Sequence, residues 1–178
     1  MCRSPLLWLA AALVAVPSLS PAQPSKERPF IRAVKVEAGP RLDGVLDDAA
    51  WQAATPVEDF TQQEPSLGQP ATERTEVRII YDARTIYIGV KAYQADGVVA
   101  TEMRRDADRL FDEDNFQVIF DTFKDSRNGY MFVTTPLGAK LEQQIFDEGE
   151  GGGRGTTSNI NRNWDGVWDA AAKISPVW

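Results

Sequence analysis

The sequence predicts an all-β protein, an antiparallel β-sandwich, from two observations. Short segments between Ile31 and Ile174 alternate apolar and polar residues with period two, which is typical of strands with one buried face. Turn signals rich in Gly, Asn, Asp and Pro separate these segments, and helical periodicity is nearly absent. Strands joined by turns, with no helices between them, favour two packed antiparallel sheets.

The first half of the chain predicts one early strand and one strong hairpin. Residues 31–36 form a plausible first strand, and Asp47 or Asp48 can cap a short helical turn over 49–51. Residues 77–81 and 86–92 then alternate strictly on either side of a four-residue turn. This pattern indicates a β-hairpin.

The second half predicts further strands. Residues 116–120 and 130–134 alternate, and Asn128-Gly129 suits a tight turn into the latter. Another strand is indicated over 141–145, and period two returns over 168–174.

A long polar stretch and the chain end complete the pattern. Residues 147–163 include five Gly within Gly149–Gly155 and predict a long mobile loop. Ser175-Pro176 is a turn signal after which Trp178 could open another strand, so we expect the domain to be incomplete at its C-terminal end.

Composition excludes several classes of function. The 178 residues contain no His, which excludes His-based catalytic triads and His-ligated zinc. The single Cys2 excludes intrachain disulfides. A net charge of −7 argues against nucleic acid as a partner. No pair of carboxylates stands out as a glycosidase centre, so we expect no enzymatic activity.

The N-terminus predicts export through the Sec pathway. Arg3 precedes an apolar run over Leu6–Val16, and a small-residue cleavage site follows, with the cut after Ala22. Residues 1–22 are therefore expected to be a signal peptide, 23–29 a mobile leader and 30–178 the folded domain. The apolar run is too short for a stable membrane span. We expect the mature protein in the periplasm, associated with the outer membrane, or outside the cell.

Three motifs in order carry a resemblance to a known family. They are an opening segment with a Leu-Asp-Gly turn and a Trp (Arg41–Trp51), a Tyr-Asp hairpin (Val77–Val90), and a strand that ends in Asp (Asp114–Asp121). In this order they resemble family 9 carbohydrate-binding modules, although Gln117 stands where the family usually has Glu. The stretch from Arg105 to Gly129 is most similar to a bacterial subgroup in which this module precedes an outer-membrane β-barrel-like region.

The resemblance implies a jelly-roll-type sandwich that binds a polysaccharide or oligosaccharide without catalysis. Such modules accompany O-glycosyl hydrolases in carbohydrate catabolism. One alternative is a periplasmic interaction domain that binds the barrel region of the same full-length protein, with no sugar ligand. Another is haem b binding, as in some relatives of this fold, for which Met103, Met131 and Lys140 are available.

Sugar binding requires flat aromatic surfaces beside fixed polar groups. Trp164 is the leading candidate because it follows the Gly-rich loop and has Asn163 and Asp165 as polar neighbours. Trp168 is either core or site, and Tyr93 could supply a second aromatic platform. Trp51 is expected in the core.

An acidic cluster has two interpretations. Asp106, Asp108, Asp112 and Asp114 could ligate structural Ca²⁺, which prefers six to eight oxygen ligands. The same carboxylates could instead form a solvated loop offset by neighbouring arginines.

Overall fold

The computed structural model describes residues 30–147 and 159–175. The chain divides into two units, Met1–Phe30 and Ile31–Trp178, and the second is compact. The predicted signal peptide and leader lie outside the described residues, as do Trp178 and residues 148–158 of the predicted loop. In the described part of the chain, no helix has the length and apolar character needed to cross a membrane.

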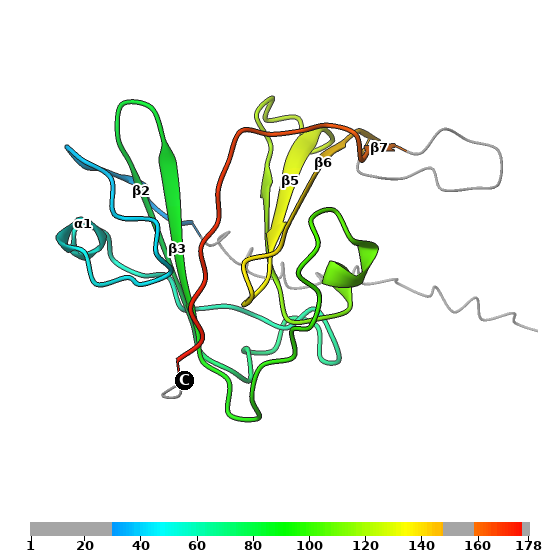
Figure 1. Cartoon of the computed structure of the whole chain (residues 1–178), viewed down its shortest axis with the longest axis horizontal. Coiled ribbons are helices and arrows are strands. Elements are labelled where there is room, and N and C mark those ends of the chain that lie inside the picture. The colour runs from blue at the N-terminus through cyan, green and yellow to red at the C-terminus, as the bar shows by residue number, and fades with distance from the viewer. Residues whose placement is uncertain (1–29, 148–158, 176–178) are drawn as a thin grey trace, which may run out of the picture. The chain divides into compact units, whose positions relative to one another are not determined.

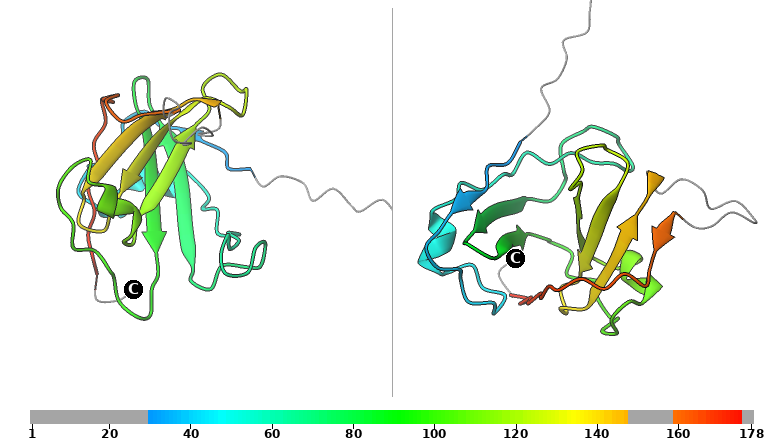
Figure 2. Two further views of the ribbon diagram at one scale, coloured as in Figure 1. Left: turned by 90° about the vertical axis from the view of Figure 1, so that its right-hand side faces the viewer. Right: turned by 90° about the horizontal axis from the view of Figure 1, so that it is seen from above.

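The second unit is mostly β, with two sheets, which is consistent with the predicted β-sandwich. The first sheet has the order β1-β2-β3, with β1 at Val34–Lys35, β2 at Thr75–Tyr81 and β3 at Ile86–Ala92. The predicted hairpin is confirmed, with Val77 opposite Val90 and Ile79 opposite Ile88. Figure 2 shows the two sheets facing each other, with α1 on the far side of the first.

The pairing of β1 corrects the expectation of a fully antiparallel fold. The short β1 runs parallel to β2, so that Val34 lies opposite Ile80. A parallel pair requires a long connection that returns the chain to its starting end. Residues 36–74 supply that connection, and they include α1 (Ala49–Gln52).

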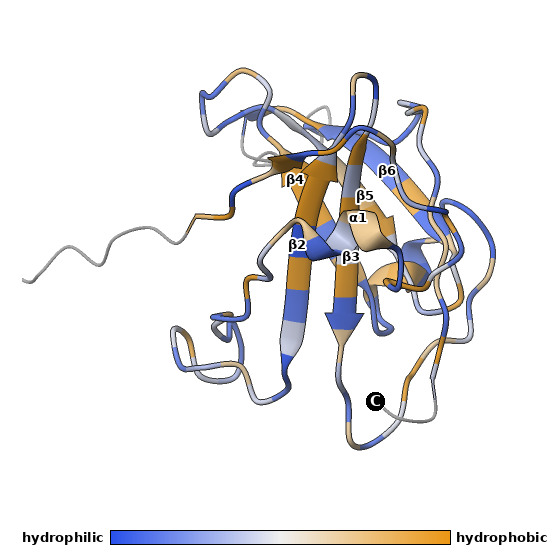
Figure 3. Cartoon of the chain, turned by 90° about the vertical axis from the view of Figure 1, so that its left-hand side faces the viewer, coloured by the Kyte–Doolittle hydropathy of each residue, from blue (hydrophilic) through white to orange (hydrophobic). Residues whose placement is uncertain are grey.

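One small core lies between α1 and the first sheet. Trp51 and Ala54 pack on Ile80, which is 0% exposed. Trp51 is buried as well, which confirms its predicted place in the core. Figure 3 shows α1 lying over β2 and β3. Asp48 is the N-cap residue, although its carboxylate accepts hydrogen bonds from Arg41 and none from the helix.

The second sheet is antiparallel with the order β4-β5-β6-β7 (Figure 1). Its strands are β4 (Phe116–Phe120), β5 (Gly129–Thr134), β6 (Lys140–Ile145) and β7 (Ile160–Asn161).

The second core covers one face of this sheet. Val133 and Leu141 pack with Leu110, which belongs to a 3-10 turn, η1 (Asp108–Phe111). Each sheet therefore has its own described cluster of buried side chains, on the face turned away from the other sheet.

The β4–β5 connection is longer than predicted. Gly129 begins β5 and is not part of a two-residue turn, because residues 121–128 form the loop. The Asp121 carboxylate accepts from the backbone N–H groups of Asp125 and Ser126, and Asp125 accepts from Asn128. These bonds stabilise a wider loop that the Asn-Gly signal did not predict.

The C-terminal period-two segment is extended but does not join a ladder. Trp168 and Ala170 are half-buried while Asp169 and Ala171 are exposed, but Ala172 and Ile174 are exposed as well, so the predicted alternation ends at Ala171. No strand is assigned over 168–174, and the short β7 lies instead within the predicted loop. Figure 1 shows this segment crossing from the β7 side toward the lower end of β3.

Candidate ligand-binding face

The inner face of the second sheet carries alternate residues of β5 and β6. On β5 these include Phe132 and Thr134, and their cross-strand partners on β6 are Glu142 and Lys140. Successive strand residues point to opposite faces, so these side chains are separated from Val133 and its core.

Aromatic rings gather on this face. Trp164 lies 4.6 Å from Tyr130 between ring centroids, and 5.7 Å from Phe132 in an edge-on arrangement. Trp168 also contacts Phe132 edge-on, at 5.1 Å. Gly166 permits this packing, because a Cβ there would lie 2.9 Å from the Trp164 ring. The result is a half-buried aromatic shelf, defined here as Tyr130, Phe132, Trp164 and Trp168.

Charged side chains hold the segment of the two tryptophans against the sheet. Lys140 Nζ donates to the backbone oxygen of Trp168 at 2.9 Å and to Asp169 at 3.0 Å. The Arg105 guanidinium bridges Glu142 and Asp165. Arg105 therefore links a buried carboxylate of the sheet to the exposed rim.

Three buried polar atoms beside Phe132 have no hydrogen-bond partner among the described residues. They are Thr134 Oγ1, Glu142 Oε2 and Trp168 Nε1. Glu142 is only 2% exposed, and its other oxygen is bound to Arg105. Buried polar groups are normally paired because an unpaired one costs free energy, so their concentration on one face is unusual.

A hollow of about 300 Å³ adjoins the aromatic shelf. Tyr130 and Gln144 form part of its wall, and they also belong to the inner face of β5 and β6. Phe123, which is 68% exposed, and Phe146 add two further rings, and Asn128 adds an amide. Aromatic surface and hydrogen-bonding amides therefore meet at this end of the sheet.

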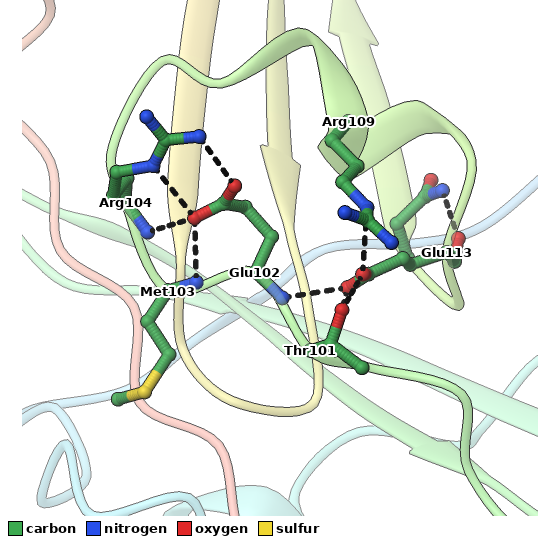
Figure 4. Close-up of polar contacts among 7 residues, drawn as sticks. Thr101, Glu102, Met103, Arg104, Arg109 and Glu113 are labelled. Atoms are coloured by element: carbon green, nitrogen blue, oxygen red, sulfur yellow. Dashed lines mark hydrogen bonds and ion pairs between the residues drawn. The ribbon is translucent and has the colours of Figure 1, made fainter.

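The loop before β4 brings Arg105 to the site, and two carboxylates hold that loop (Figure 4). Glu113 accepts from the backbone N–H groups of Thr101 and Glu102 at 2.7 and 3.0 Å. The Thr101 hydroxyl also donates to Glu113. The bond from the Glu102 N–H, followed by those from the hydroxyl and the N–H of Thr101, lowers the pKa of Glu113. Glu102 accepts from the side chain and backbone of Arg104, which lowers its pKa to about 2.

The structure brings together some of the predicted sugar-binding residues. Trp164 and Trp168 both pack on Phe132, and Asp165 joins through Arg105. Asn163 is exposed, and its backbone N–H donates to Asn161.

Tyr93 is placed elsewhere. It follows β3 on the face that packs under α1, and its hydroxyl donates to Glu76 at 2.9 Å. Burial opposes ionisation of Glu76, but this bond and one from Arg78 outweigh it and lower the pKa. Arg74 and Lys91 lie near the ring of Tyr93, at 5.0 and 4.9 Å from its centroid. Tyr93 therefore serves a structural network on the first sheet.

The predicted acidic ligands do not converge. Asp106 pairs with Arg105, Asp108 with Arg162, and Asp114 accepts from the Val99 backbone. Asp112 is exposed beyond η1. Within residues 30–147 and 159–175, no three His, Cys, Asp or Glu side chains are grouped so that they could hold a metal ion.

The three residues available for haem are also separated. Met103 is 71% exposed, and Met131 packs against the Val133 core. Lys140 lies on the opposite face of the second sheet from Met131, bound to Asp169.

Several residues of the face were not predicted from the sequence. Tyr130 and Phe132 were assigned only to a strand, and Glu142 and Arg105 were not singled out. The alternation of β5 could have identified the two rings, because it places them on one face. The ion pairs of Glu142 and Arg105 join residues 37 positions apart, which no local pattern reveals.

Comparisons of the chain with family models, curated proteins and solved structures found no match.

Proposed function

We propose that this chain is a non-catalytic carbohydrate-binding module, a jelly-roll-type sandwich of the family 9 kind. The observation that carries the proposal is the aromatic shelf on the inner face of the second sheet, with unpaired polar atoms beside it. Sugar rings have an apolar C–H face that stacks on aromatic rings and a rim of hydroxyls that needs fixed polar partners.

The hollow extends the same chemistry. Tyr130 contacts Trp164 and also lines the hollow, where Phe123 and Asn128 lie. A chain of sugar units could therefore run from the hollow onto the shelf, with an aromatic ring available in each part. This arrangement favours an oligosaccharide or polysaccharide over a single monosaccharide.

Affinity electrophoresis and titration calorimetry against a panel of glycans test the proposal. We expect binding by the wild-type chain and a loss of affinity of at least tenfold in Trp164→Ala, which removes the ring that packs against Tyr130. Tyr93→Phe is the matched control. It deletes one hydroxyl from the first sheet, so it should lower stability and leave sugar affinity unchanged. A folded wild-type chain that binds no glycan would refute the proposal.

We further propose that the module acts at the cell envelope after export. The sequence features of residues 1–22 support this, and cleavage after Ala22 would leave Gln23 as the first residue. The mass and N-terminal sequence of the protein recovered from the periplasm identify the cleavage site. Recovery of the uncut chain from the cytoplasm alone would refute export.

A further inference from the structure

Most of the buried polar atoms that lack a hydrogen-bond partner lie on residues next to Phe132. Four buried side-chain polar atoms of the described residues lack a partner, and three of them adjoin Phe132. Thr134 is two residues along β5, Glu142 is the cross-strand partner of Phe132, and Trp168 touches its ring. These three residues therefore all neighbour Phe132 on the inner face.

Their chemistry is complementary to a hydroxyl group. The free oxygen of Glu142 can only accept a hydrogen bond while ionised, and the indole N–H of Trp168 can only donate one. The hydroxyl of Thr134 can do either. A sugar hydroxyl both donates and accepts, so adjacent hydroxyls could satisfy all three atoms.

The segment that carries Trp164 and Trp168, residues 164–171, is attached to the second sheet by side chains. Residues 164–171 make no backbone–backbone hydrogen bond with other described residues, and no strand is assigned there. Among the described residues, Lys140 and Arg105 supply its polar attachments, and the side chains of Asp165 and Asp169 are exposed at 79% and 78%. Ion pairs with exposed carboxylates contribute little stability, and the rings of Trp164 and Trp168 also pack on Phe132.

Building on the proposed function, we propose that Thr134, Glu142 and Trp168 form a hydrogen-bonding subsite for the hydroxyls of an uncharged sugar. Glu142 makes the subsite selective. Its free carboxylate oxygen needs a donor, which a sugar hydroxyl provides and a uronate carboxylate does not. A sugar with its acidic group at this point would leave the oxygen unpaired and add like-charge repulsion.

Thr134→Val separates ligand binding from stability. The substitution keeps the shape of the side chain and removes a buried hydroxyl without a partner. We expect an unchanged or higher urea midpoint, together with a three- to tenfold loss of sugar affinity. Thr135→Val is the matched control on the opposite face, where the hydroxyl accepts from Ala139 N–H at 3.3 Å. It should lower the urea midpoint and leave affinity unchanged.

Calorimetry on the full chain would use pentasaccharides of glucose, xylose and mannose, and pentagalacturonate as the acidic probe. We expect at least one neutral probe to bind, pentagalacturonate to bind at least tenfold more weakly, and Glu142→Gln to narrow that difference. If Thr134→Val binds the neutral probe as tightly as wild type, or loses stability and affinity together, the subsite is refuted. The subsite is also refuted if pentagalacturonate binds as tightly as the neutral probe. Failure of every probe with the folded wild type would instead refute carbohydrate binding itself.

Discussion

Gly89 supports the contact between α1 and the first sheet, and Gly89→Ala perturbs it. A Cβ at this position would lie 2.8 Å and 2.9 Å from two ring carbons of Trp51 and 3.0 Å from Leu46. Separations this short force the indole or the strand to move. Overpacking of a core costs about 1–3 kcal/mol, while replacing Gly by Ala inside a strand recovers about 0.5–1 kcal/mol. We expect a net loss of about 0.5–2 kcal/mol in the free energy of unfolding.

A double-mutant cycle with Trp51→Phe isolates the clash. The smaller ring vacates the space that the added methyl group needs, so in this background Gly89→Ala should be neutral or slightly stabilising. Urea unfolding followed by far-ultraviolet circular dichroism gives each free energy. A coupling of about 1–2 kcal/mol is expected between the two positions. Equal losses from Gly89→Ala in both backgrounds would refute the packing argument, because they would show that Trp51 does not impose the constraint.

Three further predictions follow from the second sheet and its loop. Leu110→Ala should lower the free energy of unfolding by about 2–5 kcal/mol in urea titration, because Leu110 of η1 is 0% exposed and packs on Val133 and Leu141; a loss well under this range would contradict its burial. Glu102 and Glu113 have lowered pKa values when folded, so their contribution is present above the unfolded pKa and is lost as pH falls toward about 2 for Glu102. The urea midpoint should drop from pH 5 to pH 2.5, and less steeply in Glu102→Gln than in wild type. Gly166→Ala should displace Trp164, whose ring would lie 2.9 Å from the new Cβ, and calorimetry should show at least tenfold weaker sugar binding.

The parts of the fold that depend on local pattern could be predicted from the sequence. The β2–β3 hairpin follows from strict alternation, and Trp51 is buried as its apolar neighbours indicated. The parallel pairing of β1 could not be predicted, because it depends on the path of a connection of some forty residues. The final segment alternates only over 168–171, and it is held by Lys140 and Arg105 and not by a ladder.

The candidate site was predictable in its tryptophans and not in its polar groups. Trp164 and Trp168 stand near polar residues after a Gly-rich stretch, which is a local signal. Glu142 became a site residue only because β6 pairs with β5 and places it beside Phe132. The acidic cluster had the composition of a calcium loop, but its carboxylates bind separate arginines and backbone N–H groups. Composition alone does not predict how loop side chains converge.

The separate clusters around Ile80 and Leu110 bear on how this unit opens. Each sheet carries its own buried side chains on its outward face, so breaking one set does not directly remove the support of the other. A substitution in one cluster should then change the rate of amide hydrogen–deuterium exchange mainly in its own sheet. Leu110→Ala should therefore accelerate exchange in β5 more than in β2. Such a molecule can loosen the sheet that carries the aromatic shelf while its other half stays ordered.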